Sequence, residues 1–356
     1  MAAQVPTSPA PSSSRHYRVV QWATGNVGTR ALRAVIEHRH LELAGVYVYS
    51  KDKAGRDAGE LCGSAPTGIL ATQDIEKVLS LGADCVLYMP RFSEFDHVCR
   101  LLAAGTNIVT TRGEFLRAGS LAPEVRERVE AACQSGGTSI HSTGSSPGFV
   151  SEALPFVLAS VQRRLDGLTI DEFADLSTRA SPELLFEVMG FGADPAQFDH
   201  GRWAHGAIAF GPTLRAFADA VSLPLDAVEA SGEIATARRA IDIAAGRLEA
   251  GTVAAQRMLV TGMRNGSPLL RFRANWYCTT ELEPAWSLRE TGWHLLVEGD
   301  APLDVEIRFP VPPEHYAEVS PAYTANRAVN AVPYVCEAAS GLHSTADLPQ
   351  LIPTLG

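Results

Sequence analysis

The pattern of apolar and polar residues divides the chain into two regions. Up to about His141, short apolar runs alternate with segments whose apolar residues recur every three or four positions, which predicts alternating strands and helices and hence a doubly wound parallel sheet. The predicted strands are Arg18 to Trp22, Leu43 to Tyr49, Cys85 to Met89, Asn107 to Thr110 and Thr138 to His141. The predicted helices are Thr29 to Arg39, Ile75 to Leu81, Phe95 to Ala104 and Pro123 to Gln134.

After about Gly148 apolar and polar residues alternate instead. The pair Asn265-Gly266 between two such runs is a strong signal for a hairpin turn. This region predicts a second, α+β domain with an open, mostly antiparallel sheet that has one face covered by helices. The alternating runs are Arg238 to Ile243, Gln256 to Thr261, Leu269 to Tyr277, His294 to Glu298 and Asp304 to Phe309.

A glycine-containing turn joins the first predicted strand to the first predicted helix. The turn consists of Ala23, Thr24, Gly25, Asn26, Val27 and Gly28. It matches the dinucleotide-binding pattern G-x-G-x-x-G with Ala23 in place of the first glycine; Gly25 stands where the backbone approaches a pyrophosphate and Gly28 where helix and strand pack closely. We expect residues 24–28 to bind a cofactor at the helix N-terminus. The alternative is an ordinary strand-turn-helix corner.

These patterns predict an α/β chain with a Rossmann-type dinucleotide-binding domain over residues 16–148 and a substrate and dimerisation domain over 149–325. Residues 326–356 are expected to form a helical segment, kinked or divided at Pro333, that packs back on the first domain. Residues 1–15 lack the charged start and apolar core of a signal peptide, so we expect a disordered tail there.

Composition and charge narrow the class of protein. The chain has 356 residues, of which 46% are hydrophobic and 20% charged, as in globular proteins of two domains. A net charge of −10 without a basic block argues against a nucleic acid or a membrane as partner. The six cysteines and the histidines His200, His205 and His294 follow no metal-binding spacing, so we expect reduced thiols in the cytoplasm and no metal site.

Cofactor choice is predicted from the end of the second strand. Ser50 and Lys51 stand where an NAD-selective site usually has Asp or Glu. A hydroxyl and a cation would bind a 2′-phosphate, so we expect NADP(H) to be preferred, with NAD(H) as the alternative. Lys53 and Arg56 are further candidates, whereas Asp52 favours the alternative of a solvated loop.

Glu114 is the candidate catalytic residue. In open α/β sheets ligands bind beyond the carboxyl ends of the strands, so Thr110 and Thr111 should lie beside the nicotinamide, with Glu114 close by. Glu114 is the only carboxylate in this stretch. Partly desolvated, it could hold or accept a proton near neutral pH. The alternative is a residue that only favours a helix N-terminus.

The segment from Thr143 to Phe149 comes after the next predicted strand. Its small residues, Thr143 and Gly144 among them, permit close approach of the backbone to a flat ring, and Phe149 could form an apolar wall. The alternative is a crossover between domains whose glycines only make a turn.

Five stretches of the chain resemble segments of a known family. They read VVQWATGNVGTRALRAVIEH, LELAGVYVYSKDKAGRDAGELCG, NIVTT, TGSSPGF and ELLFEVMGFG. The family is the dihydrodipicolinate-reductase-like family that includes 2,4-diaminopentanoate dehydrogenases and native NAD(P)H-dependent amine dehydrogenases. True dihydrodipicolinate reductases carry an H-H-x-x-K-x-D-A-P-S-G-T segment that is missing here, so the resemblance does not imply a role in lysine biosynthesis.

The amine dehydrogenase branch implies roles for particular residues. Glu114 matches a glutamate that engages ammonia or the amine. The implied substrate pocket consists of Ser145, Phe149, Leu176, Met189 and His205. Ser145 stands where some relatives have a large aromatic residue, which implies a roomier pocket.

We therefore expect an NADP-preferring amine dehydrogenase that aminates a ketone or aldehyde reductively with ammonia and catalyses the reverse deamination. Its partners would be the small carbonyl or amine substrate, ammonia and a second copy of the chain, because the broad second sheet offers a dimer surface. One alternative is a diamine or amino-acid dehydrogenase. Another is an NADP-sensing protein without turnover, against which Glu114 argues.

Overall fold

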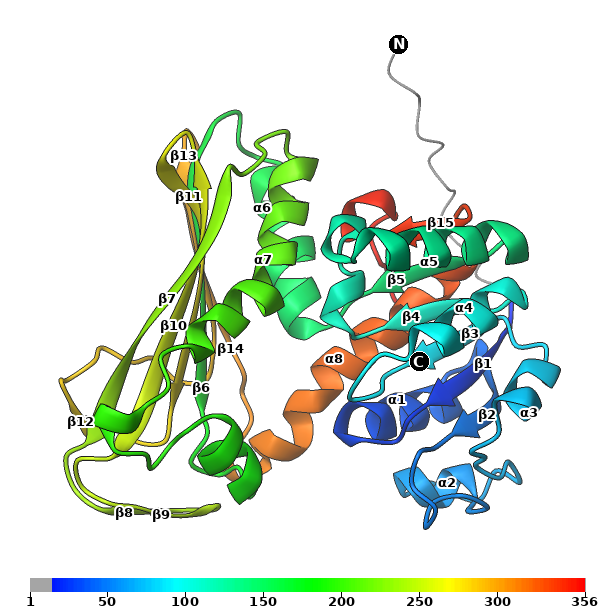
Figure 1. The fold of residues 1–356 in the computed structure, drawn as a ribbon, viewed down its shortest axis with the longest axis horizontal. Helices are drawn as coiled ribbons and strands as arrows, with labels where there is room; N and C mark the ends of the chain where they lie inside the picture. Colours follow the sequence, from blue (N-terminus) through cyan, green and yellow to red (C-terminus); the bar gives the residue numbers. More distant parts are fainter. Residues whose placement is uncertain (1–14, 356) are drawn as a thin grey trace. The chain divides into compact units, whose positions relative to one another are not determined.

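The computed structural model describes residues 15–355, and the tail expected over residues 1–15 lies outside this range except for Arg15. The chain forms two compact units (Figure 1). The first contains Met1–Phe149 and Ser320–Gly356, and the second contains Val150–Val319.

The first unit is built on a six-stranded sheet in the order β15-β5-β4-β3-β1-β2, in which every neighbouring pair is parallel. The strands are β1 (Tyr17–Trp22), β2 (Leu41–Tyr47), β3 (Cys85–Tyr88), β4 (Asn107–Thr110), β5 (Ser139–Ser142) and β15 (Gly341–His343). The chain reverses its direction of travel across the sheet between β1 and β3. Open α/β sheets bind ligands at such a switch point, beyond the carboxyl ends of the strands.

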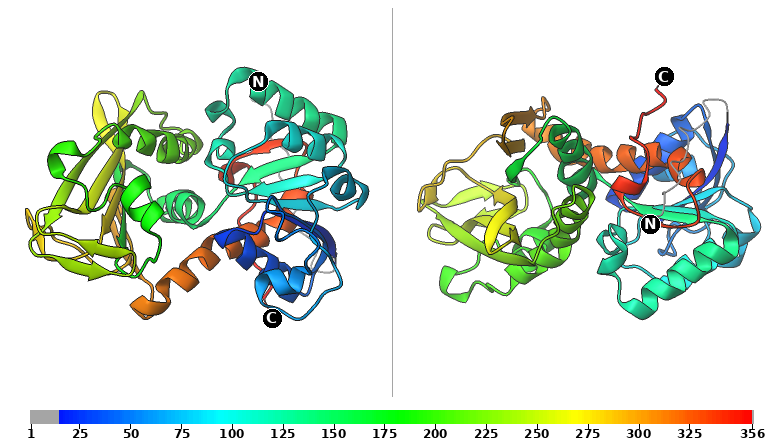
Figure 2. Two further views of the ribbon diagram at one scale, coloured as in Figure 1. Left: turned by 60° about the horizontal axis from the view of Figure 1, so that its bottom comes forward. Right: turned by 90° about the horizontal axis from the view of Figure 1, so that it is seen from above.

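Helices cover both faces of this sheet, as a doubly wound fold requires (Figure 2). They are α1 (Asn26–Glu37), α2 (Ala58–Cys62), α3 (Ile75–Ser80), α4 (Phe95–Ala103), α5 (Pro123–Gly136) and the later part of α8 (Pro313–Cys336). Val19 of β1 packs in one apolar core with Leu32 of α1 and Val332 of α8. The next residue, Val20, packs in the other core with Leu101 of α4. The alternation of neighbouring side chains thus joins β1 to both layers.

The C-terminal part of this unit differs from the expectation. The structure has one helix, α8, that begins before the expected Asn326 and continues past Pro333 to Cys336. The segment before Asn326 has few large apolar residues, so its helical period is weak in the sequence. Beyond α8, the short strand β15 pairs with β5 and completes the sheet.

The second unit is built on a seven-stranded sheet in the order β12-β7-β10-β11-β6-β13-β14. The strands are β6 (Leu165–Asp175), β7 (Ala227–Ala237), β10 (Val253–Arg264), β11 (Ser267–Tyr277), β12 (Leu282–Glu283), β13 (Gly292–Gly299) and β14 (Leu303–Arg308). All neighbouring pairs are antiparallel except β11 and β6. The prediction of a mostly antiparallel sheet is therefore confirmed. Asn265 and Gly266 lie at φ values of 51° and 72°, the left-handed pair that a tight hairpin needs.

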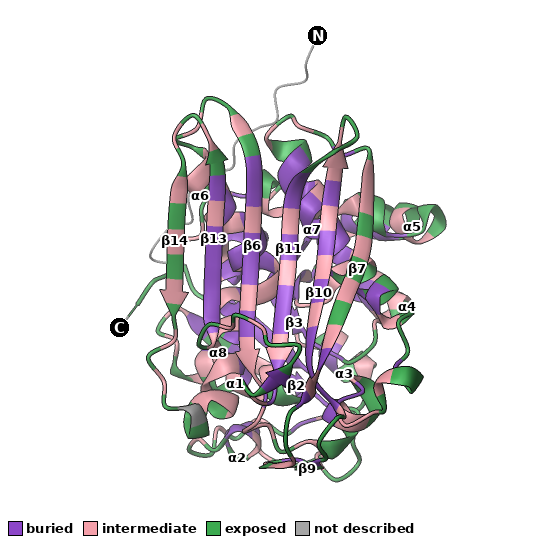
Figure 3. Cartoon of the chain, turned by 90° about the vertical axis from the view of Figure 1, so that its left-hand side faces the viewer, coloured by how far each residue is buried: buried purple, intermediate pink, exposed green. Residues whose placement is uncertain are grey.

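One face of this second sheet is covered by α6 (Leu154–Ala159) and α7 (Arg202–Ala220), as predicted. Figure 3 shows the opposite face, on which no helix lies within the described residues of the second unit. The strand predicted over Arg238 to Ile243 is wrong for its first part: only β8 (Ile241–Ile243) forms, and it pairs with β9 (Gly246–Leu248) outside the main sheet. Arg238 comes directly after the end of β7 and donates its backbone N–H to Glu281.

Candidate active site

The glycine-containing turn connects β1 directly to α1. Ala23, at the position of the missing glycine, has a φ of 72°, a left-handed conformation that costs an alanine free energy. Its carbonyl oxygen accepts a hydrogen bond from Nε2 of Gln21 at 2.8 Å. A Cβ atom on Gly28 would lie 2.2 Å from the same carbonyl oxygen. Only glycine at position 28 therefore lets α1 pack so closely on the turn.

The N-terminus of α1 is open to a ligand. Its N-cap residue, Gly25, makes no side-chain cap, and the first turn contains no acidic residue, so the positive end of the helix is not neutralised locally. A Cβ on Gly25 would meet nothing within 4 Å among the described residues. The backbone N–H groups at the start of α1 thus face open space at Gly25, which fits the pyrophosphate of a dinucleotide.

The loop after β2 contacts this turn through a residue other than those first expected. Lys53 donates from Nζ to the carbonyl oxygen of Thr24 at 2.9 Å and to its Oγ1 at 3.3 Å. The Ser50 hydroxyl instead donates to the carboxylate of Asp52, and Lys51 is exposed. The structure thus brings Lys53 to the turn and leaves Ser50 and Lys51 in the outer part of the loop.

Aromatic side chains at the ends of β1 and β2 pack against one another. The sequence patterns did not indicate this cluster. The Trp22 ring stacks on Tyr47 with centroids 3.7 Å apart, and its Nε1 donates to the hydroxyl of Tyr49 at 3.0 Å. Trp22 is fully buried. These side chains therefore tie the ends of β1 and β2 to each other.

Glu114 lies in a short 3-10 turn, Gly113–Phe115, directly after β4. Its Oε1 accepts hydrogen bonds from Oγ of Ser93 at 2.5 Å and from Nε of Arg112 at 3.3 Å. Arg112 in turn donates to the carbonyl oxygen of Arg91 at 2.8 Å. The side chain of Glu114 is 26% exposed, and its Oε2 accepts no hydrogen bond from any residue in 15–355. One carboxylate oxygen is thus fixed and the other is available to a ligand.

The two predicted segments after β4 and β5 meet at the sheet edge. The backbone N–H of Thr143 donates to the carbonyl oxygen of Thr110 at 2.9 Å, and the Thr110 hydroxyl donates to the carbonyl oxygen of Tyr88 at 2.6 Å. Thr143 is only 1% exposed, yet its hydroxyl has no hydrogen-bond partner among residues 15–355. A buried polar atom without a partner costs free energy, which a polar group of a bound cofactor would recover. Thr111, which follows Thr110, is half-buried.

Helix α8 supports the segment after β5. The hydroxyls of Ser145 and Thr324 are 2.7 Å apart, and the Ser145 N–H donates to the same Thr324 oxygen at 3.3 Å. A Cβ on Gly144 would come within 3.1 Å of the Thr324 methyl group. Thr324 was not expected from the sequence, because 179 residues separate it from Ser145.

The expected pocket residues are distributed over both units. Ser145 and Phe149 belong to the first unit, and Leu176, Met189 and His205 belong to the second. Leu176 is buried in the apolar core of the second unit and Met189 packs against that core. His205 is exposed on α7.

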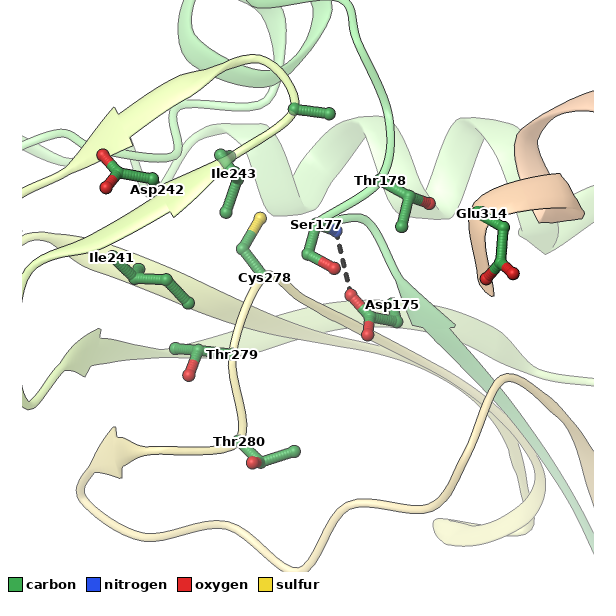
Figure 4. Close-up of a pocket in the computed structure, with 11 residues that line it drawn as sticks. Asp175, Ser177, Thr178, Ile241, Asp242, Ile243, Cys278, Thr279, Thr280 and Glu314 are labelled. Atoms are coloured by element: carbon green, nitrogen blue, oxygen red, sulfur yellow. Dashed lines mark hydrogen bonds between the residues drawn. The ribbon is translucent and has the colours of Figure 1, made fainter. Parts of the chain in front are cut away.

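A separate cavity of about 660 Å³ lies within the second unit (Figure 4). Asp175, Asp242 and Glu314 line it, together with hydroxyl-bearing and apolar residues, and no Lys or Arg of the described chain does. The Ser177 N–H donates to the Asp175 carboxylate at 2.9 Å. Burial raises the pKa of the Cys278 thiol to about 12, so this lining residue stays protonated at neutral pH.

Metal-binding clusters and membrane-spanning helices were sought among residues 15–355. Within that range there is no group of three His, Cys, Asp or Glu side chains that could hold a metal ion. In the same range no helix is long and apolar enough to cross a membrane.

Comparisons with known proteins cover nearly the whole chain. Residues 149–355 match the family described as 2,4-diaminopentanoate dehydrogenase C-terminal domain, and residues 19–113 match the family described as dihydrodipicolinate reductase, N-terminus. An amine dehydrogenase of Streptomyces virginiae is 30% identical over 357 residues, covering 95% of this chain and 97% of that protein. The solved structure of an amine dehydrogenase from Mycobacterium smegmatis has the same fold, with a TM-score of 0.75, 19% identity and coverage of 96% of this chain and 98% of that one.

Proposed function

The chain belongs to the amine dehydrogenase and 2,4-diaminopentanoate dehydrogenase family, and we propose that it catalyses the reductive amination of a small ketone or aldehyde with ammonia and the reverse oxidative deamination. The observation that carries this proposal is the position of Glu114. It is a carboxylate at the carboxyl edge of the parallel sheet, with Oε1 held by Ser93 and Arg112 and Oε2 free of hydrogen bonds from residues 15–355.

Glu114 moves the protons of the reaction in this proposal. Its free oxygen accepts a proton as ammonia adds to the carbonyl carbon, and it returns a proton to the oxygen that leaves as water. The nicotinamide, when bound, supplies the hydride that reduces the resulting carbon–nitrogen double bond. Ser93 and Arg112 keep the carboxylate oriented, which limits the reorganisation needed in each step.

The cofactor proposal is NADP(H) in preference to NAD(H). Residues 24–28 would hold the pyrophosphate, and the loop that begins with Ser50 and Lys51 would select the 2′-phosphate. Thr110, Thr111, Thr143 and Gly144 would lie beside the nicotinamide. Support comes from the uncapped N-terminus of α1 and from the Thr143 hydroxyl, which no group in residues 15–355 satisfies.

Ser145, Phe149, Leu176, Met189 and His205 remain our candidates for residues that contact the carbonyl substrate. The carboxylates of Asp175, Asp242 and Glu314 around the cavity of the second unit favour a second candidate, the dehydrogenation of a diamine whose distal ammonium needs a negative partner. The matching C-terminal family is that of 2,4-diaminopentanoate dehydrogenase, whose name gives a substrate with two amino groups.

We also propose that the enzyme acts in the cytoplasm as a homodimer. The face of the second sheet that Figure 3 shows supports the dimer, because the ion pairs on it carry both signs of charge. Arg273 binds Asp171 with two hydrogen bonds of 2.6 Å, and Arg257 lies 3.4 Å from Glu233. A face with both signs can pair with its own copy about a twofold axis.

The test is a spectrophotometric screen of NADPH oxidation with ammonium and a panel of small ketones and aldehydes. The matched control omits ammonium, because oxidation that does not need ammonium would indicate carbonyl reduction instead. NADP⁺ reduction by diamines and by monoamines of equal length separates the two candidate functions. Tight NADPH binding without turnover on any substrate would support the sensing alternative and contradict our proposal.

A further inference from the structure

Lys53 is the cation of the loop after β2 that contacts the turn between β1 and α1. Its Nζ lies 2.9 Å from the carbonyl oxygen of Thr24 and 3.3 Å from its Oγ1. Lys53 comes from the loop that leaves β2, whereas Thr24 belongs to the turn between β1 and α1. The ammonium therefore lies where the loop and the turn meet, and the side chain is half-buried there.

The neighbouring candidates are placed less favourably for an anion. The Ser50 hydroxyl donates to the carboxylate of Asp52, so its proton is already used and a negative charge lies beside it. Lys51 is exposed and makes no hydrogen bond or ion pair with residues 15–355. Arg56 binds Glu60 at 2.7 Å. Among these described cations of the loop, Lys53 is therefore the one fixed against the turn.

We propose that Lys53 selects NADP(H) by binding the 2′-phosphate of the adenosine ribose. The inference rests on the proposed NADP(H) dependence and names the residue responsible for it. The loop at the end of the second strand faces the ribose 2′-position in dinucleotide folds. An ammonium has three N–H donors, and Thr24 accepts from two of them, which leaves one for a phosphate oxygen. The first turn of α1 adds no competing acid.

The experiment measures the dissociation constants of NADP⁺ and NAD⁺ by calorimetry, without substrate, for the full chain and for Lys53→Met. We expect the variant to bind NADP⁺ about tenfold or more weakly, the scale of one charge-assisted hydrogen bond. Its affinity for NAD⁺ should change less than about twofold, since NAD⁺ lacks the phosphate that the ammonium contacts. The control is Lys77→Met, which removes an exposed lysine of α3 and should change neither constant.

Further variants separate a phosphate contact from a structural one. Lys53→Arg should recover most of the preference for NADP⁺, and added salt should weaken NADP⁺ binding more in the wild type than in Lys53→Met. If Lys53→Met is poorly folded by thermal unfolding, Lys53→Gln, which keeps a donor for Thr24, takes its place. Equal losses of NADP⁺ and NAD⁺ affinity in Lys53→Met would overturn the proposal. It would also be overturned if Lys51→Met lost the preference for NADP⁺ over NAD⁺ while Lys53→Met kept it. Binding of neither cofactor by the wild type would instead refute the proposed function itself.

Discussion

At the scale of single residues, Glu114 carries the proposed chemistry. In Glu114→Gln the amide oxygen can still accept from Ser93, but the side chain no longer takes up and returns a proton. We expect reductive amination to slow by at least about a hundredfold, with the dissociation constant of NADPH unchanged by calorimetry. Glu127→Gln, on the exposed side of α5, is the matched control. Turnover like that of the wild type in Glu114→Gln would remove this residue from the mechanism.

The sequence predicted the place of Glu114 but not its partners. The apolar run Asn107 to Thr110 indicates the strand, and because ligands bind beyond the carboxyl ends of such strands, the residues directly after Thr110 become candidates. Ser93, in contrast, lies 21 residues away in the loop after β3. It reaches Glu114 only because β3 pairs with β4. Lys53 was one of several candidate cations in its loop, and the sequence could not single it out, since which of them turns inward depends on the fold of the loop.

At the scale of elements, the joint between β1 and α1 allows a test with two glycines. Gly28→Ala should destabilise the fold by about 1–3 kcal/mol or more, because the new Cβ meets a backbone carbonyl that cannot rotate away. Gly25→Ala should leave stability unchanged, since its φ of −75° suits alanine and the Cβ meets open space. It should nevertheless weaken NADP(H) binding by filling the space for the pyrophosphate. Thermal unfolding measures the stability of the two variants, and calorimetry measures their affinity for NADP(H). A Gly28→Ala variant as stable as the wild type would contradict the close packing.

The pairing of β5 with β15 predicts a pH dependence of stability. Burial lowers the pKa of His141 to about 4, and its neutral ring donates from Nδ1 to the carbonyl oxygen of His343 at 2.9 Å. The unfolded state, with a pKa near 6.5, then binds the proton more readily, so stability should fall as pH drops from about 6.5 towards 4, by roughly 3 kcal/mol in all. Urea unfolding at pH 7 and pH 4.5 measures this loss. A variant His141→Gln with the same loss would show that another group causes it.

Elements were predictable where the apolar period is strong. Strands β1 to β5 and helices α1, α3, α4 and α5 lie within a few residues of their expected ends, because continuous apolar runs mark buried parallel strands. Helix α2 was not predicted, and α8 begins well before its expected start. β7 was missed since its residues, Ala227–Ala237, are mostly small, and β15 is too short to show a period. β6, Leu165–Asp175, was not predicted as a strand either. Its parallel pairing with β11 could not have been predicted in any case, because alternation shows which face of a strand is buried and not which strand lies beside it.

At the scale of the whole molecule, the chain returns to its first unit at Ser320, and α8 spans that boundary. The contact of Thr324 with Ser145 results from this return, and no local pattern near either residue indicates it. Long-range closure of this kind depends on the path of the whole chain. The polar, uncovered face of the second sheet could not be predicted from local sequence either. A strand pattern shows which residues face outward but not whether another element covers them.

The uncovered face of the second sheet allows a test of the proposed dimer. Leu259 is half-buried on it, between Ser231 and Arg273 of the neighbouring strands. Leu259→Arg would place a further cation beside Arg273, and at a dimer interface this charge would be desolvated without a partner, which costs several kcal/mol. Light scattering after size-exclusion chromatography should therefore give twice the chain mass for the wild type and the single mass for the variant.

A matched substitution on the other side of the sheet separates interface loss from a general effect of charge. The opposite face packs on α7, where Phe272 stacks on Phe210 with centroids 4.0 Å apart. Ile208 on the same helix is 73% exposed, so Ile208→Arg should leave the chain dimeric. A wild type of single mass would refute the dimer. A Leu259→Arg variant that keeps the double mass would show that the copies associate through another surface, because no interface buries an unpaired arginine without loss of affinity.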